Sequence, residues 1–462
     1  KTYMKIQCCF AVKDPTGLSW PGVLADYESR KRYYMNLLNE TFGNEFEFVY
    51  SSLMAHASDQ DLEALTHDDG FIMILLAHGT GLGQRVAPLL KHGLIIDDPY
   101  GGSGDIIRTT GIIKEKQYPV GTVGTEDVES LLHKIRVYLA VPKIKNSRIL
   151  VFKNFERMTP LKEAEFKRSI GTGSTMKRYI AGKQGFGQNL DTIKNTFGVE
   201  IVVKTLKELN DCIDQVDEKD AAALAKKWID HAEEMVEPTY DDVFASAKMY
   251  FALEKLKREA NADVVSVDCI LLFFAYDLTV YPCLSFFEMS NSGEIGICEG
   301  DLDACITSLI IRAISGRPGF VSDPFVDTET NQIVYAHCVA SCKPLGPAHA
   351  SFPYKIRTHS EDNASAALQV IMPVGYPLTT IKVSASGKAM SIHSGESIGN
   401  VDHASGCRTK LVCKVKSSRK IMENWHNELF SWHRVTVFGD YREDFLDVAK
   451  YLGLTVYDED NM

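Results

Sequence analysis

The feature that most constrains the fold is a regular alternation between short apolar runs and amphipathic segments over residues 1–146. Residues 71–76 are apolar throughout, which is typical of a strand buried on both faces of a sheet. Three further strands are expected at residues 6–12, 46–50 and 93–96. Two helices are expected at residues 24–38 and 126–139. Strands and helices that alternate in this way predict a parallel α/β sheet covered by helices.

A second α/β domain is expected at residues 147–319, where apolar runs again alternate with helical patterns. The expected strands lie at 148–152, 199–203 and 270–275, and the expected helices at 206–216, 218–235 and 240–260. Thr239 precedes the acidic pair Asp241 and Asp242, which is typical of a helix N-cap followed by an acidic first turn.

Residues 320–462 have a different character. Between residues 331 and 415, short strand-like runs are broken by Gly, Pro, Ser and Asn, which favours antiparallel strands. Residues 434–457 return to a strand–helix–strand pattern. We therefore predict an α/β protein with two parallel-sheet domains of flavodoxin- or Rossmann-like type, at 1–146 and 147–319. A mixed, largely antiparallel β domain with an α/β tail follows at 320–462.

Composition limits the partners and the compartment. The formal net charge is −11, which argues against a nucleic acid or an anionic membrane as a dedicated partner. The eleven cysteines include no CxxC pair, and several lie in apolar runs, as expected for free buried thiols in a reducing cytoplasm. The N-terminus shows no apolar core of signal-peptide length, and no apolar run is long enough to span a bilayer. We expect a cytoplasmic protein.

Three separated segments carry side chains suited to a metal site. Glu299 lies between an expected strand and a helix that starts near Asp301, where the helix dipole favours a charged carboxylate. Asp323 precedes a proline at a turn or a strand end, and His433 precedes a strand. Each has a structural alternative: a capping carboxylate, turn chemistry or a packed histidine. For Asp301 we prefer the capping interpretation.

Two carboxylates and an imidazole suit Mn²⁺ or a similar divalent ion. Such a set also meets the needs of aldose–ketose interconversion through a cis-enediol. A divalent ion stabilises the charge that develops on O1 and O2, and carboxyl groups move the carbon-bound and hydroxyl protons.

Several short motifs in the second half of the chain resemble the L-fucose isomerase and L-arabinose isomerase superfamily. Their order and approximate spacing match, whereas the first half resembles the family only in pattern. The motifs are Pro282-Cys283-Leu284, Cys298-Glu299-Gly300-Asp301-Leu302, Phe320-Val321-Ser322-Asp323, Ala336-His337-Cys338, Tyr354-Lys355-Ile356-Arg357-Thr358-His359 and Trp432-His433-Arg434-Val435-Thr436-Val437-Phe438-Gly439-Asp440-Tyr441.

The resemblance implies roles for individual residues. Glu299 and Asp323 match the family's metal-binding carboxylates, which are also its proton-transfer pair. His433 matches the third ligand, and His337 a fourth ligand used in the arabinose branch. The cofactor expected from this set is Mn²⁺, or another divalent ion such as Co²⁺ or Mg²⁺.

The resemblance also implies a substrate and an assembly. The implied substrate is a small sugar, but the resemblance does not indicate which one. Arg357 and His359 are expected near the substrate. The family forms hexamers or trimer-based assemblies in which a neighbouring subunit's N-terminal domain completes the active site. His78 is therefore a candidate contact in trans.

Three other patterns have simpler interpretations. The glycines at 79, 81 and 83 do not follow the GxGxxG spacing of a dinucleotide fingerprint, because its third glycine is missing, and they favour a tight turn. Backbone N–H groups in this turn could still hold a sugar hydroxyl or a phosphate. The glycine-rich stretch 171–177 lacks the spacing of a phosphate loop and favours a surface loop. Cys338 and Cys342 beside His337 are a weak zinc signal.

Two alternatives to the isomerase stay open at the level of sequence. One is another metal-assisted sugar enzyme on the same scaffold, such as an epimerase or a lyase acting on a modified sugar, because it would use the same enediolate chemistry. The other is a non-catalytic sugar-binding protein, because parallel sheets bind ligands at their carboxyl edges.

Overall fold

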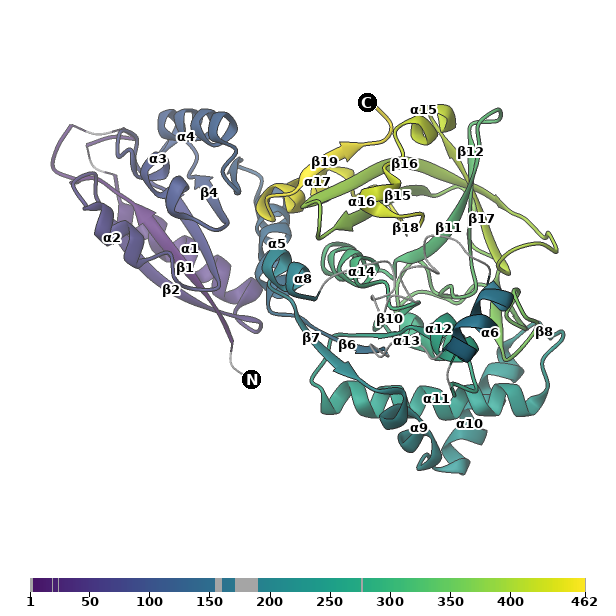
Figure 1. Cartoon of the computed structure of the whole chain (residues 1–462). Helices are drawn as coiled ribbons and strands as arrows, with labels where there is room; N and C mark the ends of the chain where they lie inside the picture. Colours follow the sequence, from purple (N-terminus) through teal and green to yellow (C-terminus); the bar gives the residue numbers. More distant parts are fainter. Residues whose placement is uncertain are drawn as a thin grey trace. The chain divides into compact units, whose positions relative to one another are not determined.

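The structure is a computed structural model that describes residues 3–18, 20–23, 25–153, 160–170, 190–275 and 277–461 (Figure 1). The glycine-rich stretch 171–177 lies outside these residues. The chain divides into two compact units. Unit 1 comprises Lys1–Lys143 and Glu443–Thr455, and unit 2 comprises Ile144–Arg442 and Val456–Met462. The three-domain division stays a prediction, because unit 2 contains both a parallel sheet and an antiparallel one.

Unit 1 is built on a five-stranded parallel sheet with the order β2-β1-β3-β4-β5. The strands are β1 (Met4–Ala11), β2 (Phe46–Leu53), β3 (Gly70–Leu75), β4 (Gly93–Asp97) and β5 (Val120–Gly124). The helices are α1 (Tyr27–Phe42), α2 (Asp59–Ala64), α3 (Leu82–Val86), η1 (Ala87–Leu89), α4 (Ser103–Lys116), α5 (Val128–Lys145) and α17 (Arg442–Tyr451). Every residue of β3 is buried, which confirms the strand predicted from its unbroken apolar run.

The end of the chain returns to unit 1 through α17. His133 on α5 contacts the Asp444 carboxylate at 2.9 Å, and Lys134 binds Asp447 at 2.7 Å. The ring of Tyr451 packs against that of Tyr138 with the centroids 5.1 Å apart. The predicted strand–helix–strand pattern at the tail is confirmed, and its helix belongs to the core of unit 1.

Unit 2 begins with a four-stranded parallel sheet of order β10-β9-β6-β7. Its strands are β6 (Arg148–Phe152), β7 (Glu200–Lys204), β9 (Val264–Val267) and β10 (Ile295–Cys298). The helices of this part are α6 (Pro160–Ile170), α8 (Leu190–Phe197), α9 (Leu206–Asp214), α10 (Glu218–His231), α11 (Tyr240–Glu259), α12 (Cys269–Ala275), α13 (Cys283–Asn291) and α14 (Leu302–Ser315). Thr239 caps α11 in a capping box with Asp242, as its position predicted.

The strand predicted at 270–275 is wrong, since these residues form helix α12. The sheet position is taken instead by β9, a run of four buried residues directly before it. Leu272 N–H then donates to the Asp268 carbonyl at 3.0 Å, which closes the first helical turn. An apolar run this short has no period that separates a strand from a buried helix.

Six antiparallel strands of unit 2 close into a barrel of order β15-β18-β11-β12-β17-β16, because β15 also pairs with β16. They are β11 (Phe320–Asp327), β12 (Gln332–His337), β15 (Pro377–Ser384), β16 (Ala389–Asn400), β17 (Thr409–Val415) and β18 (Arg434–Phe438). β19 (Thr455–Asp458) pairs with β16, and a small sheet joins β8 (Glu234–Met235), β13 (Tyr354–Arg357) and β14 (Ala367–Val370). The short helices α15 (Ser418–Glu423) and α16 (Asn427–Phe430) precede β18. The prediction of an α/β protein with parallel sheets and an antiparallel β part is confirmed at this level.

Helix α14 connects the two sheets of unit 2. It contacts β9 and β10 of the parallel sheet and β15 and β18 of the barrel, and Figure 1 shows it between them. All residues from Leu302 to Ile311 are buried, as expected for a helix with apolar neighbours on both sides. The N-terminus of α14 therefore lies where the parallel sheet meets the barrel.

None of the helices within the described residues combines the length and the apolar character that crossing a bilayer requires.

Candidate metal centre

Glu299 occupies the turn that joins β10 to α14. Its φ is +62°, a left-handed conformation that is uncommon outside glycine and that concentrates at functional sites. Asp301 then caps α14 by accepting a hydrogen bond from Ala304 N–H at 3.0 Å, which confirms the capping prediction. Gly300 between them also has a φ of +62°, and a Cβ there would lie 2.6 Å from Cε of Lys153. A side chain at position 300 would therefore displace Lys153 and adopt a backbone conformation that favours glycine.

Asp323 and His433 are brought together by strand pairing. β11 pairs with β18 from Phe320 to Ser322, with Ser322 opposite Arg434. Asp323 and His433 are the next residues along these antiparallel strands, and Asp323 Oδ1 lies 3.2 Å from His433 Nε2. The turn or strand end predicted at Asp323 is wrong, since β11 continues to Asp327. Beyond Ser322, β11 pairs only with β12, so Pro324 sits on an open edge where its missing N–H costs little.

Three of the four predicted metal ligands, Glu299, His337 and His433, come together, and Asp323 adjoins them through His433. Glu299 Oε2 lies 3.8 Å from His433 Nε2. His337, the last residue of β12, joins them, and ligand atoms of Glu299, His337 and His433 all lie within 4.8 Å of one another. His337 Nε2 is buried and has no hydrogen-bond partner among the described residues. Two carboxylates and two imidazoles that converge in this way fit a divalent ion such as Mn²⁺.

The protonation of this cluster reflects its burial. Burial raises the pKa of Glu299 to about 7, although the nearby His433 opposes the shift. Burial alone would lower the pKa of His433, but Asp323, Asp301 and Glu299 raise it to about 10. Burial would likewise raise the pKa of Asp323, yet His433 holds it below its usual range. The cluster thus retains a proton on His433 near neutral pH, at the position where a cation would bind.

A buried second layer holds His433 in place. Asp301 Oδ2 lies 3.0 Å from His433 Nδ1 and also accepts a hydrogen bond from the ammonium of Lys382 on β15. Burial would raise the pKa of Asp301, but Lys382 and His433 hold it well below its usual range. A histidine whose Nδ1 is fixed in this way presents Nε2 to a metal. Sequence analysis missed Lys382, whose signal in the sequence is a charge between Ile381 and Val383 in a strand-like run.

The carboxyl edge of the parallel sheet carries further charged side chains. Lys153 follows β6, Asp268 follows β9 and Glu299 follows β10. Lys153 Nζ lies 3.8 Å from Asp268 Oδ2, and both side chains are almost fully buried. Burial lowers the pKa of Lys153, while Asp268 opposes the shift. The centre therefore lies at the edge where parallel sheets bind their ligands, and sequence analysis missed Lys153 and Asp268.

A cavity of about 580 Å³ opens beside Asp323. The Asp323 side chain is 39% exposed, and the residues that line the cavity with it include Glu361, Cys407 and Lys410. Loss of water around the carboxyl raises the pKa of Glu361. Cys407 Sγ lies 4.0 Å from Asp323 Oδ2. The volume is within the range of small-molecule sites, about 300–1,000 Å³, and sequence analysis had not selected these wall residues.

Arg357 and His359 are not among the residues that line this cavity. The Arg357 guanidinium binds Glu237 at 2.6 Å and Gln369 at 2.5 Å. His359 is buried, stacks on Tyr281 with ring centroids 4.2 Å apart, and places Nδ1 3.6 Å from an oxygen of Asp362.

His78 belongs to unit 1, where its Nδ1 lies 3.4 Å from Asp105 Oδ1. The Asp105 carboxylate also accepts hydrogen bonds from the N–H groups of Gly79, Thr80 and Gly81 at 2.8–3.1 Å. The amides of this glycine-containing turn therefore bind a carboxylate of the chain itself.

No protein-family model matches the chain. No curated protein matches it either. Among solved structures, the chain resembles a C2-type ketoreductase from a modular polyketide synthase, with 14% sequence identity and a TM-score of 0.21. The match covers 60% of this chain and 74% of the ketoreductase. A TM-score this low supports no conclusion about fold or activity.

Proposed function

We propose that this protein is a metal-dependent isomerase that interconverts an aldose and a ketose through a cis-enediol. The observation that carries the proposal is the cluster of Glu299, His337 and His433, with Asp323 beside His433 and on the wall of a cavity of about 580 Å³. These side chains come from four different parts of the fold. Together they provide a ligand set for one divalent ion and two carboxyl groups for proton transfer.

The residues divide the chemistry between them. A divalent ion held by Glu299, Asp323 and His433, with His337 as a fourth ligand, supplies Lewis-acid stabilisation of charge on the sugar oxygens. Glu299 is the proposed base for the carbon-bound proton. Burial raises the pKa of its carboxyl to about 7 in the metal-free centre, and an ion bound to the carboxylate would lower that pKa. Asp323 is the second carboxyl and moves the hydroxyl proton. Asp301 positions His433 and does not touch the substrate.

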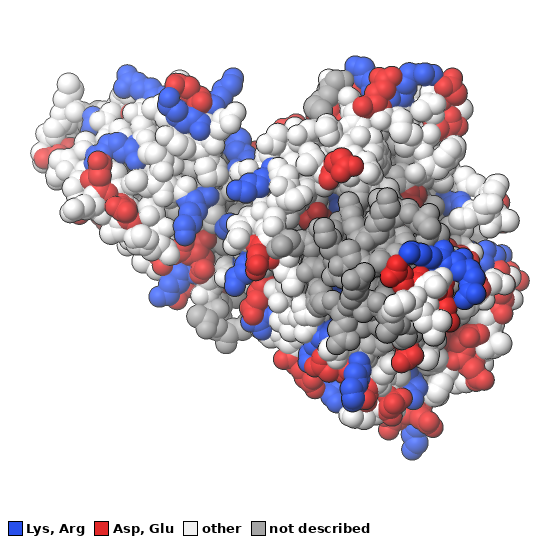
Figure 2. All heavy atoms as spheres, in the orientation of Figure 1, with Lys and Arg blue, Asp and Glu red and all other residues white. Residues whose placement is uncertain are grey.

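The remaining family properties belong to the same proposal. The strand order of unit 1 is that of flavodoxin-like sheets, which supports membership of the L-fucose and L-arabinose isomerase superfamily. Membership implies a homo-oligomer, a hexamer or a trimer-based assembly, in which His78 reaches a neighbouring subunit's site. A cytoplasmic location accords with the eleven free cysteines. We also propose that nucleic acid is not a partner, because the formal net charge is −11 and the face in Figure 2 intermingles acidic and basic side chains.

The experiment is a turnover assay on pentoses, deoxyhexoses and modified hexoses with Mn²⁺, before and after EDTA. We expect turnover of at least one sugar, its loss with EDTA and its return with added Mn²⁺. Product NMR in D₂O separates the alternatives, because isomerisation places deuterium only at C1 or C2. An epimer, a cleaved product, or no turnover of any sugar at full metal occupancy would contradict the isomerase.

Metal affinity should rise with pH. Since the pKa of His433 is about 10 in the metal-free protein, its imidazole is protonated at neutral pH and must lose that proton to bind a metal. We expect the Mn²⁺ affinity to increase about tenfold per pH unit between pH 5.5 and 7.5 for each proton released. Calorimetric titration in two buffers of different ionisation enthalpy counts the protons. An affinity that does not change with pH, with no proton release, would contradict this account of His433.

A further inference from the structure

Four buried thiols gather next to the metal centre. Cys298 directly precedes Glu299, and Cys338 directly follows His337. Cys269 and Cys283 are the first residues of α12 and α13. All four are at most 5% exposed. They come from four separate parts of the fold, so the spacing of the cysteines in the sequence does not predict that their thiols lie close together.

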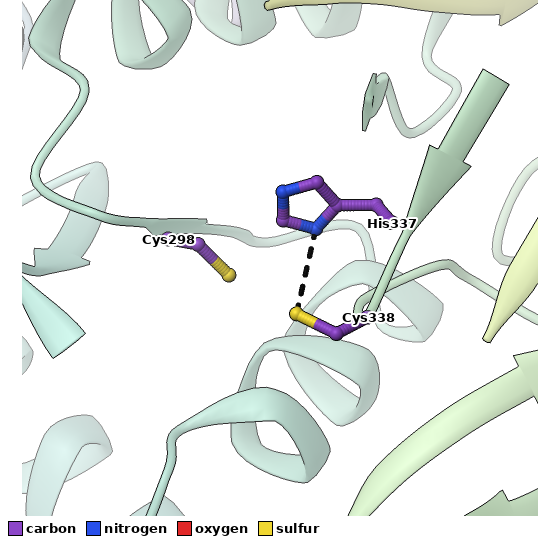
Figure 3. A group of neighbouring side chains, drawn as sticks. All are labelled: Cys298, His337 and Cys338. Carbon is purple, nitrogen blue, oxygen red and sulfur yellow. Dashed lines mark hydrogen bonds between the residues drawn. The ribbon is translucent and has the colours of Figure 1, made fainter. Parts of the chain in front are cut away.

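The centre of the group is Cys338. Its Sγ lies 3.6 Å from His337 Nδ1, and ligand atoms of Cys298, His337 and Cys338 all lie within 4.8 Å of one another. Figure 3 shows the two sulfurs and the imidazole directed into the same space. Cys338 also interacts with the thiol of Cys283. Neither Cys283 nor Cys342 is part of this group of three, and Cys283 adjoins it through Cys338.

We propose that this protein binds a second metal ion, Zn²⁺, in a closed thiolate site. Its ligands are Cys283, Cys298, Cys338 and Nδ1 of His337. Three thiolates and one imidazole are a ligand set that selects zinc in tetrahedral geometry, whereas the carboxylates of the first centre suit harder ions. The site has no open position for a substrate, so its role is structural.

The zinc site would also act on the first centre through His337. An ion on Nδ1 would fix the ring, and Nε2 would bind the ion held by Glu299 and His433 only after the ring releases its remaining N–H proton and bridges the two ions as an imidazolate. The inference does not depend on the proposed function, because the thiol group binds zinc whether or not the first centre turns over a sugar.

Cobalt titration of the metal-depleted protein tests the site. We expect one equivalent of Co²⁺ to produce thiolate-to-cobalt charge-transfer absorption and the visible bands of tetrahedral cobalt, and Zn²⁺ to abolish both. X-ray absorption of the zinc form should show sulfur ligands at about 2.3 Å.

Variants separate the two centres. Cys298→Ser and Cys338→Ser should each weaken the thiolate absorption and the double variant should lose it, whereas the buried control Cys342→Ser and the first-centre variant Asp323→Asn should keep it. If a cysteine variant fails to fold, the presence or absence of thiolate absorption in the wild-type spectrum still tests the proposal. The proposal is overturned if wild-type protein with fully reduced thiols binds Co²⁺ without thiolate absorption, or if that absorption survives both cysteine substitutions.

Discussion

Replacing Glu299 with Gln should weaken Mn²⁺ binding more than ~100-fold and lower turnover by about 10²–10⁴-fold. Gln keeps the shape of the side chain but loses the charge that binds the ion and the group that accepts the carbon-bound proton. Calorimetric titration and a turnover assay at saturating Mn²⁺ measure the two effects separately. The exposed Glu396 on β16 provides the matched control, and Glu396→Gln should change neither quantity.

The same substitution should affect stability in opposite directions with and without metal. Burial raises the folded-state pKa of Glu299 from 4.5 to about 7, so its contribution to stability falls as pH rises through that interval. Without metal at pH 8, Glu299→Gln should therefore be more stable than wild type, by up to about 3 kcal/mol. With Mn²⁺ at 100 times its Kd, wild type gains about 2.7 kcal/mol and the variant gains little. A variant that binds Mn²⁺ like wild type would contradict the assigned role of Glu299.

Replacing Asp301 with Leu should produce the largest loss of stability. The substitution leaves Lys382 buried without its carboxylate, and breaking a buried ion pair from one side costs about 3–5 kcal/mol. His433 also loses the acceptor for Nδ1, so Mn²⁺ affinity should fall about 10–100-fold. Denaturant unfolding and metal titration measure these losses.

The double variant Asp301→Leu with Lys382→Met is the control. It replaces both charges, so most of the stability should return, because apolar replacements of a whole buried pair are often neutral. The Mn²⁺ affinity should stay low, since the acceptor for His433 is still missing. A single variant that loses less than about 1 kcal/mol and binds Mn²⁺ normally would contradict the positioning role of Asp301.

Local patterns predicted the surroundings of Glu299 well. An apolar run, an acidic residue and an amphipathic segment indicated the strand, the turn and the capped helix that the structure contains. The parallel strands of unit 1 were predictable for the same reason, because a short apolar run between two helical segments is typical of a buried strand in a parallel sheet.

The errors and omissions have a common cause in tertiary pairing. Residues 270–275 form a helix because β9 already occupies the sheet position before them. Asp323 lies inside a strand because β11 pairs with β12 as far as Asp327, and the pairing of β11 with β18 ends at Ser322, before Pro324. Lys382, Asp268 and the thiols around Cys338 gain their roles only from neighbours distant in sequence, and a single sequence does not show which segments meet.

Crystals grown with Mn²⁺ and measured on both sides of the manganese absorption edge test the central claim most directly. The account predicts one anomalous peak that contacts carboxylate oxygens of Glu299 and Asp323 and Nε2 of His433. A manganese peak elsewhere, or these three side chains without a shared ion at saturating Mn²⁺, would contradict it.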